Sequence, residues 1–437
     1  MRRLEEQYPT QLAVVGVHSG KFTAERVTSN VRQAVQRLEV AHPVVNDRFF
    51  RIWRSYGVSA WPTLVLIDPG GYYVGSHAGE VTAESFAPFV ERLARRFAGQ
   101  LDERPLPLRL EPQAATPLRF PGKLHLSGDR LFISDTGHNR LLVLRLDRDG
   151  SRGQVEAVVG GGRAGLADGG FEEAAFDHPQ GLYLGGDTLY VADTGNHALR
   201  TVDLGRRQVR TLAGAEGEAL GLSPLGVAAR TTLRSPWDVL ALDGSLYVAM
   251  AGSHQLWRVR LATGEIGPYA GTGREDLVDG PAAEAALAQP TGLAHDGRRL
   301  YFADCESSAV RWADLQAGGR VNTVVGTGLF DFGDRDGRGE AVRLQHSYGL
   351  AYADGRLYVA DTYTNKVKVI DPDARTAAAF LGTGEAGDRD GEQPQFWEPQ
   401  GIAAGEGRLY IADTNNHKIK VADVGARRVE TLAIEGL

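Results

Sequence analysis

The sequence YVADTYTNKVKVI, residues 358–370, is one of six related copies spread along this chain. The others read FISDTGHNRLLVL (132–144), YVADTGNHALRTV (190–202), YVAMAGSHQLWRV (247–259), YFADCESSAVRWA (301–313) and YIADTNNHKIKVA (410–422). Successive copies are 52 to 58 residues apart. A period of this length, with short β-rich segments in each repeat, predicts the blades of a six-bladed β-propeller.

Each repeat opens with a Pro-x-Gly motif or a variant of it. Full motifs stand at 179–181, 290–292 and 399–401. The first repeat has Pro121 directly before Gly122, the third has Asp238 in the glycine position after Pro236, and the fifth has Ser347 with Gly349. A short strand, an aromatic strand, an alternating third strand and a short fourth strand follow, so four strands per blade are expected.

An Asp-Thr-x-Asn type of turn follows the aromatic strand of most repeats. Aspartate and asparagine side chains bond nearby backbone amides and tolerate the left-handed region, which favours a structural role for this turn. A binding role on one propeller face is the alternative. Its candidate residues are Asp135, Asn139, Asp193, His197, Asp361, Asn365, Asp413 and His417.

Histidines recur at the last position of this turn, at His197, His254 and His417. Each stands four residues after the position that aspartate holds in most repeats. A ring of ligands would require them to meet within about 2 Å of one ion, and equivalent positions on different blades lie far apart. We therefore expect no metal site from this set, and the sequence predicts no cofactor.

A second group of candidates belongs to the first strands, near the mouth of the expected axial channel. These are Trp237, Asp238, His346 and Tyr348. They would serve a propeller hydrolase or lyase that acts in the channel, an alternative that predicts metal-dependent turnover lost on changing His346 or Asp238. Polar residues are also normal at a solvated channel mouth, and the sequence has no Gly-x-Ser-x-Gly, His-Glu-x-x-His or phosphate-loop motif.

These repeats resemble NHL repeats, and the resemblance covers about three quarters of the chain. Acidic loops join most of them, with Asp-Gly pairs at 168–169, 279–280, 336–337 and 390–391. The connection 215–234 lacks such a pair. We expect the loops to rim one face of the disc, either as solvated turns or as a binding rim.

Residues 1–98 do not repeat and alternate strand and helix signals, which predicts an α/β domain. The apolar run 12–17 predicts a buried strand, and 24–38 predicts a helix. Trp61, Pro62 and Thr63, followed by an apolar strand, resemble the cis-proline loop of the thioredoxin fold, so a cis bond is expected at Pro62. A linker at 99–117 and the propeller at 118–437 follow, and a strand at 106–110 could help to close the ring.

The stretches VHSGKF (17–22), HPVVND (42–47) and GVSAWPT (57–63), ahead of the propeller, resemble the NHL-repeat-containing protein 2 family. That resemblance implies a Cys-x-x-Cys motif early in the thioredoxin-like domain, which this sequence does not contain. Cys305, the single cysteine, stands in the fourth repeat. We hypothesise that Met1 is a misassigned start or a truncation, which would leave a long apolar sheet edge exposed.

The function expected from these features is that of a protein- or peptide-binding scaffold, a redox-inactive thioredoxin-like domain docked on an NHL propeller. One alternative is a thiol–disulfide oxidoreductase whose catalytic cysteines lie upstream of Met1, because dithiol exchange needs an attacking and a resolving thiol. The axial hydrolase or lyase is the other.

Charge and composition limit the classes of partner that the sequence predicts. Residues 1–98 carry 12 basic and 9 acidic side chains, which leaves 36 basic and 46 acidic ones of the total 48 and 55 for residues 99–437. An acidic propeller does not favour nucleic acid. Without a long apolar run, a secretory signal or paired cysteines, the sequence predicts a cytoplasmic protein, a monomer with a protein or peptide partner and no membrane contact.

Overall fold

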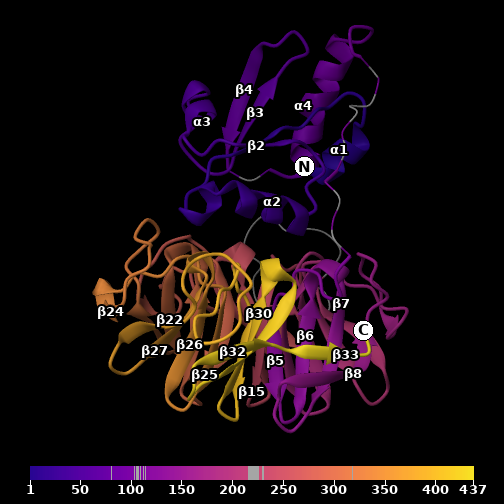
Figure 1. The fold of residues 1–437 in the computed structure, drawn as a ribbon. Coiled ribbons are helices and arrows are strands. Elements are labelled where there is room, and N and C mark those ends of the chain that lie inside the picture. Colours follow the sequence, from indigo (N-terminus) through magenta and orange to yellow (C-terminus); the bar gives the residue numbers. More distant parts are fainter. Residues whose placement is uncertain are drawn as a thin grey trace. The chain divides into compact units, whose positions relative to one another are not determined.

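The computed structural model divides the chain into two compact units, Met1–Ala115 and Thr116–Leu437 (Figure 1). It describes residues 1–79, 81–102, 104, 108, 110, 111, 113, 115–214, 226–228, 231–316 and 318–437. Within those ranges, no helix is both long and apolar enough to cross a membrane. Each unit has its own core and is described separately.

The N-terminal unit is an α/β domain. Its elements are α1 (Arg2–Gln7), β1 (Gly16–His18), a 3-10 turn (Ala24–Arg26), α2 (Thr28–Arg37), β2 (Val44–Asn46), α3 (Arg51–Ser55), β3 (Thr63–Ile67), β4 (Tyr73–Ala78) and α4 (Ala83–Arg96). The hydroxyl of Thr82 accepts the N–H of Ser85 and caps α4, as its position before an apolar helical face predicts. Leu4 and Val90 are buried, and α1 contacts α4.

The strands of this unit form two separate pairs. β1 and β2 pair in parallel, β3 and β4 pair antiparallel, and no further strand among the described residues joins either pair. The prediction of a buried strand at 12–17 is therefore wrong. Val15 and Val17 are 57% and 43% exposed, and only the end of this run belongs to a strand, β1, which pairs with one other strand among the described residues. Helix α2 also begins later than predicted, since a 3-10 turn takes up residues 24–26.

The second unit is a six-bladed β-propeller, as the repeats predict. Each blade has four antiparallel strands, with the first strand of each blade nearest the axis. Blades 1 to 3 contain β5 (Leu124–Ser127), β6 (Arg130–Asp135), β7 (Arg140–Leu146), β8 (Arg152–Val159); β10 (Pro179–Gly185), β11 (Thr188–Asp193), β12 (Ala198–Asp203), β13 (Gln208–Ala213); and β15 (Pro236–Leu242), β16 (Ser245–Met250), β17 (Gln255–Arg260), β18 (Glu265–Ala270). Blades 4 to 6 contain β20 (Pro290–His295), β21 (Arg299–Asp304), β22 (Ala309–Asp314), β23 (Arg320–Val325); β25 (Gly349–Ala353), β26 (Arg356–Asp361), β27 (Lys366–Asp371), β28 (Thr376–Leu381); and β29 (Ile402–Gly405), β30 (Arg408–Asp413), β31 (Lys418–Asp423), β32 (Arg428–Thr431).

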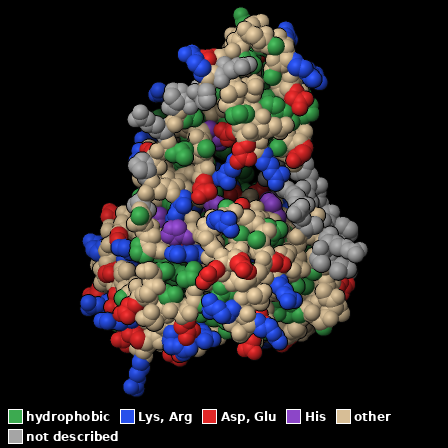
Figure 2. Space-filling model, turned by 90° about the vertical axis from the view of Figure 1, so that its right-hand side faces the viewer, with side chains coloured by type: hydrophobic (Ala, Val, Ile, Leu, Met, Phe, Trp, Pro, Cys, Tyr) green, Lys and Arg blue, Asp and Glu red, His purple; other side chains and the backbone are tan. Residues whose placement is uncertain are grey.

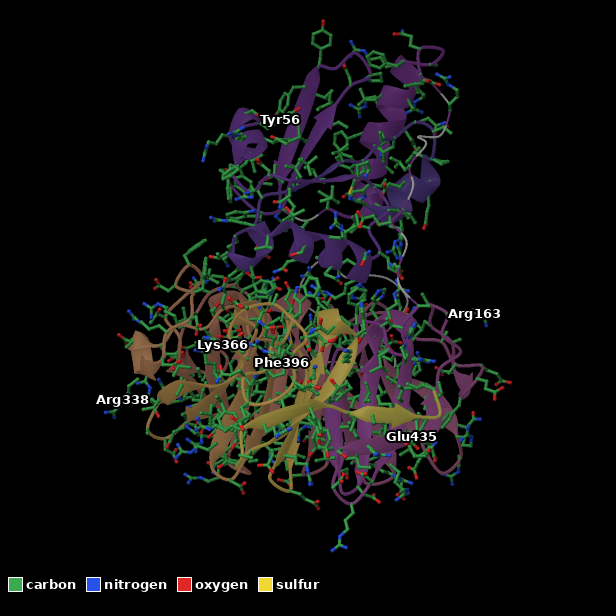
Figure 3. All side chains as sticks on the ribbon, in the orientation of Figure 1. Tyr56, Arg163, Arg338, Lys366, Phe396 and Glu435 are labelled. Carbon is green, nitrogen blue, oxygen red and sulfur yellow. The ribbon has the colours of Figure 1, made fainter. Side chains whose placement is uncertain are left out.

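Most blades gain a short fifth strand at the outer edge, which the repeat did not predict. The loop before the blade supplies it: β9 (Gly169–Gly170), β14 (Gly226–Val227), β19 (Gly280–Pro281) and β24 (Gly337–Arg338) pair with the fourth strands of blades 2 to 5. Figure 3 labels Arg338 at this outer edge. The Asp-Gly loops thus belong to the blades rather than standing apart as a rim. Figure 2 shows acidic and basic side chains interspersed over the visible propeller surface, not gathered by sign.

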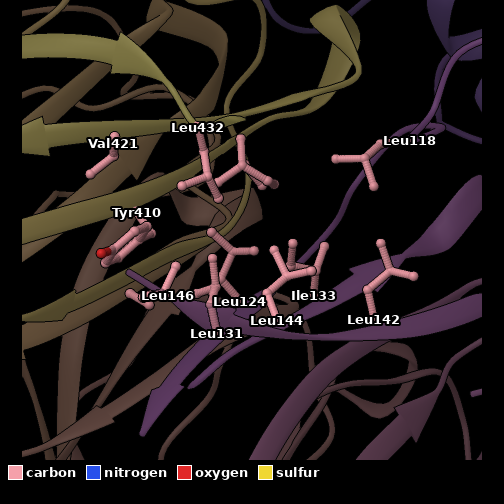
Figure 4. Close-up of a cluster of buried hydrophobic side chains, with 13 residues drawn as sticks. Leu118, Leu124, Leu131, Ile133, Leu142, Leu144, Leu146, Tyr410, Val421 and Leu432 are labelled. Carbon is pink, nitrogen blue, oxygen red and sulfur yellow. The ribbon is translucent and has the colours of Figure 1, made fainter. Parts of the chain in front are cut away.

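The ring closes at blade 1. The C-terminal strand β33 (Ala433–Glu435) pairs in parallel with β8 and forms the fifth strand of that blade (Figure 1). Leu118 and Leu432 share a buried cluster with Leu124 and Tyr410, which joins blade 6 to blade 1 (Figure 4). The predicted closing strand at 106–110 lies largely outside the described residues.

The propeller core consists of six apolar clusters, one between each pair of neighbouring blades. Phe176 lies between blades 1 and 2, and Phe396 between blades 5 and 6. Figure 3 labels Phe396 within the body of the propeller. Because each cluster draws on two blades, the blades stabilise one another around the ring.

Candidate functional site

The anchor aspartates, which hold the first position of the turn after each aromatic strand, bind the backbone just before the first strand of their own blade. Asp193 Oδ1 accepts the N–H of Asp177 at 2.8 Å, and Asp361 Oδ1 accepts that of Gln345 at the same distance. Asp135, Asp304 and Asp413 each accept the N–H of the residue 16 positions earlier in the same way. All five carboxyl groups are buried. These residues therefore hold the turn and the entry to the blade in register.

The last residue of the turn links one blade to the next. Asn139, His197, Asn365 and His417 all adopt the left-handed conformation, with φ between 51° and 57°. The side chain of each accepts a backbone N–H from the following blade, at 2.9 to 3.0 Å. His417, for example, accepts the N–H of Phe120 through Nδ1 and so joins blade 6 to blade 1. The structure spreads the eight turn candidates around the ring and brings no shared site together from them.

The threonine of the turn makes a second link between blades. Thr194 Oγ1 donates to Pro236 O at 2.6 Å, and Thr414 Oγ1 donates to Pro121 O at 2.9 Å. Thr136 and Thr362 bond the prolines of their next blades in the same way. The Asp-Thr-x-Asn turn thus satisfies backbone groups inside and between blades, which supports the structural interpretation.

Burial raises the pKa of the anchor carboxyls despite their hydrogen bonds. Desolvation raises the pKa of Asp193 and Asp361 to about 6 and that of Asp413 to about 7. It also raises the pKa of Asp304. Burial disfavours the charged form, and the donors and nearby cations only partly offset this effect.

Four buried cations lie beside the anchor aspartates of blades 2, 4, 5 and 6. Arg311 Nη1 donates to Asp304 Oδ2 and its Nη2 donates to Asp279 Oδ1, both at 2.9 Å. Arg200 makes the same pair of bonds to Asp193 and Asp168. Lys368 and Lys420 bind the carboxylates of the loops before blades 5 and 6. The acidic loops are therefore neutralised from within the blades, which leaves less negative charge for a binding rim.

An ion pair crosses the propeller axis. Lys123 Nζ lies 3.5 Å from Asp238 Oδ2 and donates to the carbonyl oxygens of Thr291 and Tyr348. Asp238 also accepts the N–H of Leu293 from the next blade at 2.9 Å. Burial lowers the pKa of Lys123 and raises that of Asp238, while their mutual attraction opposes both shifts.

This pair corrects the description of the blade 1 motif. Lys123 pairs with the second strand as Gly401 does, because its O accepts the N–H of Ser134 and Gly401 O accepts that of Ala412. Lys123, not Gly122, therefore occupies the glycine position of Pro-x-Gly. Blades 2, 4, 5 and 6 have glycine there, and a Cβ at Gly349 would meet Gln400 O at 2.2 Å. The two departures from the motif, Lys123 and Asp238, are the two partners of the ion pair.

Trp237, His346 and Tyr348 gather beside this pair. The rings of Trp237 and Tyr348 are 5.6 Å apart, and His346 Nε2 lies 3.2 Å from Tyr348 Oη. These three residues and Asp238 are the sequence candidates that the structure brings together. Sequence analysis missed Lys123, although its place in the misaligned first motif was the available signal.

A cavity of about 240 Å³ lies on the other side of the ion pair, along the axis. Lys123, Asp238, His125, His295 and Tyr352 are among its lining residues. Burial lowers the pKa of His125 to about 4 and also lowers that of His295. Neutral imidazoles next to a buried carboxyl and amine could receive a small polar molecule.

The loop at Trp61 is the candidate site of the N-terminal unit. The Trp61–Pro62 bond is cis, as predicted. The Trp61 ring lies 4.5 Å from that of Trp53, and its Nε1 donates to Ser19 O at 2.8 Å, yet the side chain stays 48% exposed. Thr63 Oγ1 donates to Ala60 O and closes the loop. The indole therefore offers a fixed apolar surface at the start of β3.

Comparison with known proteins places these features in a wider group. Residues 396–422 match the NHL repeat family. The chain is 39% identical over 463 residues to the protein SUPPRESSOR OF QUENCHING 1, chloroplastic, of Arabidopsis thaliana, and 37% identical over 477 residues to NHL repeat-containing protein 2 of Gallus gallus. Both alignments span 99% of this chain, which covers 44% and 65% of the relatives' lengths. The structure of a nidogen/laminin complex is similar with a TM-score of 0.46 and 12% identity, over 70% of this chain and 92% of that one.

Proposed function

Since the chain belongs to the NHL repeat-containing protein 2 family, we propose that it binds polypeptide, and that an extended segment pairs with the open edge of β3 beside Trp61. The observation that carries this proposal is the pairing of β3. One edge bonds β4, and no strand among the described residues bonds the other. An open edge next to exposed apolar side chains is a template for strand addition.

The backbone groups available for such pairing can be identified. Gly79 N–H donates to Pro62 O, so by alternation the backbone N–H and C=O groups of Leu64 and Leu66 point to β4. The N–H groups of Thr63 and Val65 therefore point to the open edge. A bound strand would use these groups and cover part of the Trp61 ring.

The surroundings favour an apolar segment with acidic flanks. Phe50 lies 6.3 Å from Trp61, and the Arg26 guanidinium lies 5.3 Å from the Phe50 ring. Arg48 and Arg51 approach the ring of Phe49, which is exposed. Arginines around an aromatic surface attract carboxylates at its rim and help to orient the ligand.

Binding of a labelled peptide tests the proposal. The probe is an alternating Val-Thr peptide with glutamate flanks, compared with the same peptide with lysine flanks, by fluorescence anisotropy. We expect the acidic peptide to bind more tightly, and Trp61→Ala and Val65→Pro each to weaken it at least about tenfold, or about 1.4 kcal/mol.

The matched control is Ser76→Pro. By the same alternation, Ser76 N–H points away from β3, to the outer edge of β4. Equal weakening by Val65→Pro and Ser76→Pro would reject the assigned edge, and no binding of either peptide would reject the proposed function. In a longer protein, an upstream segment bound to this edge would compete with the peptide. The same segment, added to this chain as a synthetic strand, should then displace the labelled peptide.

The axial cavity supports a second candidate, an enzyme acting on a small molecule. The buried Lys123–Asp238 pair at its floor is the observation that favours it. Screening for turnover of lactone and ester substrates would test it. Activity lost in His295→Ala and kept in Trp61→Ala would support this candidate over peptide binding alone.

A further inference from the structure

Three side chains with metal-binding groups meet where blade 4 joins blade 5. Cys305 and Glu306 follow β21 in a 3-10 turn, Cys305–Ser307, and His346 lies just before β25. One ligand atom from each lies within 4.8 Å of the others. Cys305 and His346 are 1% and 5% exposed, and Glu306 is partly exposed. The cluster is thus buried on two sides and open on one.

This junction is unlike the others in the ring, all of which lie in the described ranges. The counterparts of Cys305 are Thr136, Thr194, Ala251, Thr362 and Thr414; those of Glu306 are Gly137, Gly195, Gly252, Tyr363 and Asn415; those of His346 are Phe120, His178, Ser235, Gln289 and Glu398. No other junction combines three ligand-type side chains. Cysteine and glutamate each occur at their positions in blade 4 alone, and a histidine of blade 5 lies opposite them.

The His346 ring is held in an orientation that suits a ligand. Its Nδ1 lies 3.6 Å from Glu306 Oε1. Its Nε2 lies 3.2 Å from Tyr348 Oη, and the ring stacks on Tyr363 with centroids 4.5 Å apart. A metal-bound imidazole usually engages its other nitrogen with a neighbouring polar group, which fixes the tautomer and the ring plane. Tyr348 is placed to do this when Nδ1 faces the metal.

We propose that Cys305, Glu306 and His346 bind one divalent transition-metal ion of the zinc class. Thiolate sulfur, imidazole nitrogen and carboxylate oxygen are the ligands zinc takes, at about 2.0 to 2.3 Å. Ligands at those lengths in a tetrahedron lie about 3.3 to 3.6 Å apart, a spacing that Glu306 and His346 already have. A thiolate and a carboxylate balance the charge of the ion. The fourth position faces the open side and would hold water.

Cobalt substitution tests the site directly in the whole protein. The chain has a single cysteine, so a thiolate-to-cobalt charge-transfer band reports Cys305 alone. We expect this band to saturate at one Co²⁺ per chain and to disappear when Zn²⁺ is added. Cys305→Ser should abolish it, and His346→Gln and Glu306→Gln should each weaken Zn²⁺ binding at least about tenfold.

His178→Gln is the matched control, because His178 holds the same position at the junction of blades 1 and 2, opposite Thr136 and Gly137. It should leave metal binding unchanged. Lack of a charge-transfer band in the folded wild-type protein would overturn the proposal, as would equal losses in His178→Gln and His346→Gln. Thermal unfolding of each variant separates loss of the site from loss of the fold. The charge-transfer band of the wild-type protein is a test that does not depend on any variant.

Discussion

Blades 3 and 4 fill the same buried positions with different side chains, an ion network in blade 4 and an apolar pair in blade 3. In blade 4, the buried Arg311 binds Asp304 on one side and Asp279 of the outer loop on the other. In blade 3, Met250 stands in place of the aspartate and Trp257 in place of the arginine, and both are buried. The Trp257 indole N–H donates to Gln255 Oε1, which satisfies its one polar atom.

The three changes in blade 3 belong together. Removing the anchor carboxylate takes one of two carboxylate partners from the buried cation, and removing the cation takes the ion-pair partner from the carboxylate of the Asp-Gly loop. The connection before blade 3 has no Asp-Gly pair. A buried ion network and an apolar pair of similar size are thus exchangeable as sets but not one residue at a time.

The largest effect is expected from breaking the network of blade 4 by one residue. Arg311→Met would leave Asp304 buried without its cation, at a cost of about 3–5 kcal/mol. Urea unfolding followed by far-ultraviolet circular dichroism measures the loss. Arg258→Met in blade 3, where the arginine is only partly buried and lies over the Tyr269 ring, is the control and should cost less than Arg311→Met. A loss below about 1 kcal/mol for Arg311→Met would contradict a charge-paired core.

A smaller effect is expected when both residues are exchanged. Asp304→Met with Arg311→Trp installs the blade 3 pair in blade 4. The double variant should recover more than half of the loss seen with Arg311→Met, because no buried charge on the blade itself remains unpaired. The same urea midpoints test this. If the double variant is less stable than the single one, the Met–Trp pair and the Asp–Arg pair are not exchangeable between blades 3 and 4.

Removing one threonine link should cost less again. Thr362→Val deletes the bond from Thr362 Oγ1 to Pro399 O, which blade 3 lacks because Ala251 stands at that position. The expected cost is about 1 kcal/mol, with Pro399 O left buried and unbonded. Thr201→Val, which removes an exposed bond to Arg210 O, is the control. Equal effects of the two variants would show that the link between blades adds nothing.

The last effect is a dependence of stability on pH. The pKa of Asp413 is raised to about 7, so its contribution to stability is fully present below about pH 4 and is lost as pH rises through 7. Asp413→Asn removes this titration. The fall in the thermal midpoint between pH 5 and pH 8 should therefore be shallower in the variant than in the wild type. Asp203→Asn, at the partly exposed end of β12, should leave the slope unchanged. A steeper slope in Asp413→Asn would contradict the predicted direction.

Much of the propeller could be predicted because its signals are local and repeated. The six aromatic strands and the Asp-Thr-x-Asn turns were found from spacing alone, and the cis bond at Pro62 was found from its motif. The fifth strands were missed because two residues of glycine-rich loop carry no alternation to recognise.

The candidate site could be predicted only in part, since it depends on contacts across the ring. Trp237, Asp238, His346 and Tyr348 were found from their place on the first strands, but Lys123 was hidden by a motif shifted by one residue. Cys305 was not among the site candidates, because nothing local shows that His346, 41 residues later, lies close to it. In the N-terminal unit, the burial of Val15 and Val17 was mispredicted because it depends on a neighbouring strand and not on their own apolar character.

Closure of the ring by β33 has a consequence for synthesis on the ribosome. Blade 1 is made first, yet β33, which forms its outermost strand, is among the last segments to emerge. Thr414 and His417, which bond the backbone of blade 1, also emerge late. The first blade therefore waits with an open edge while some 270 residues of the other blades are translated. Chaperones that shield strand edges would act on this interval, and the finished ring would hide the edge they recognised.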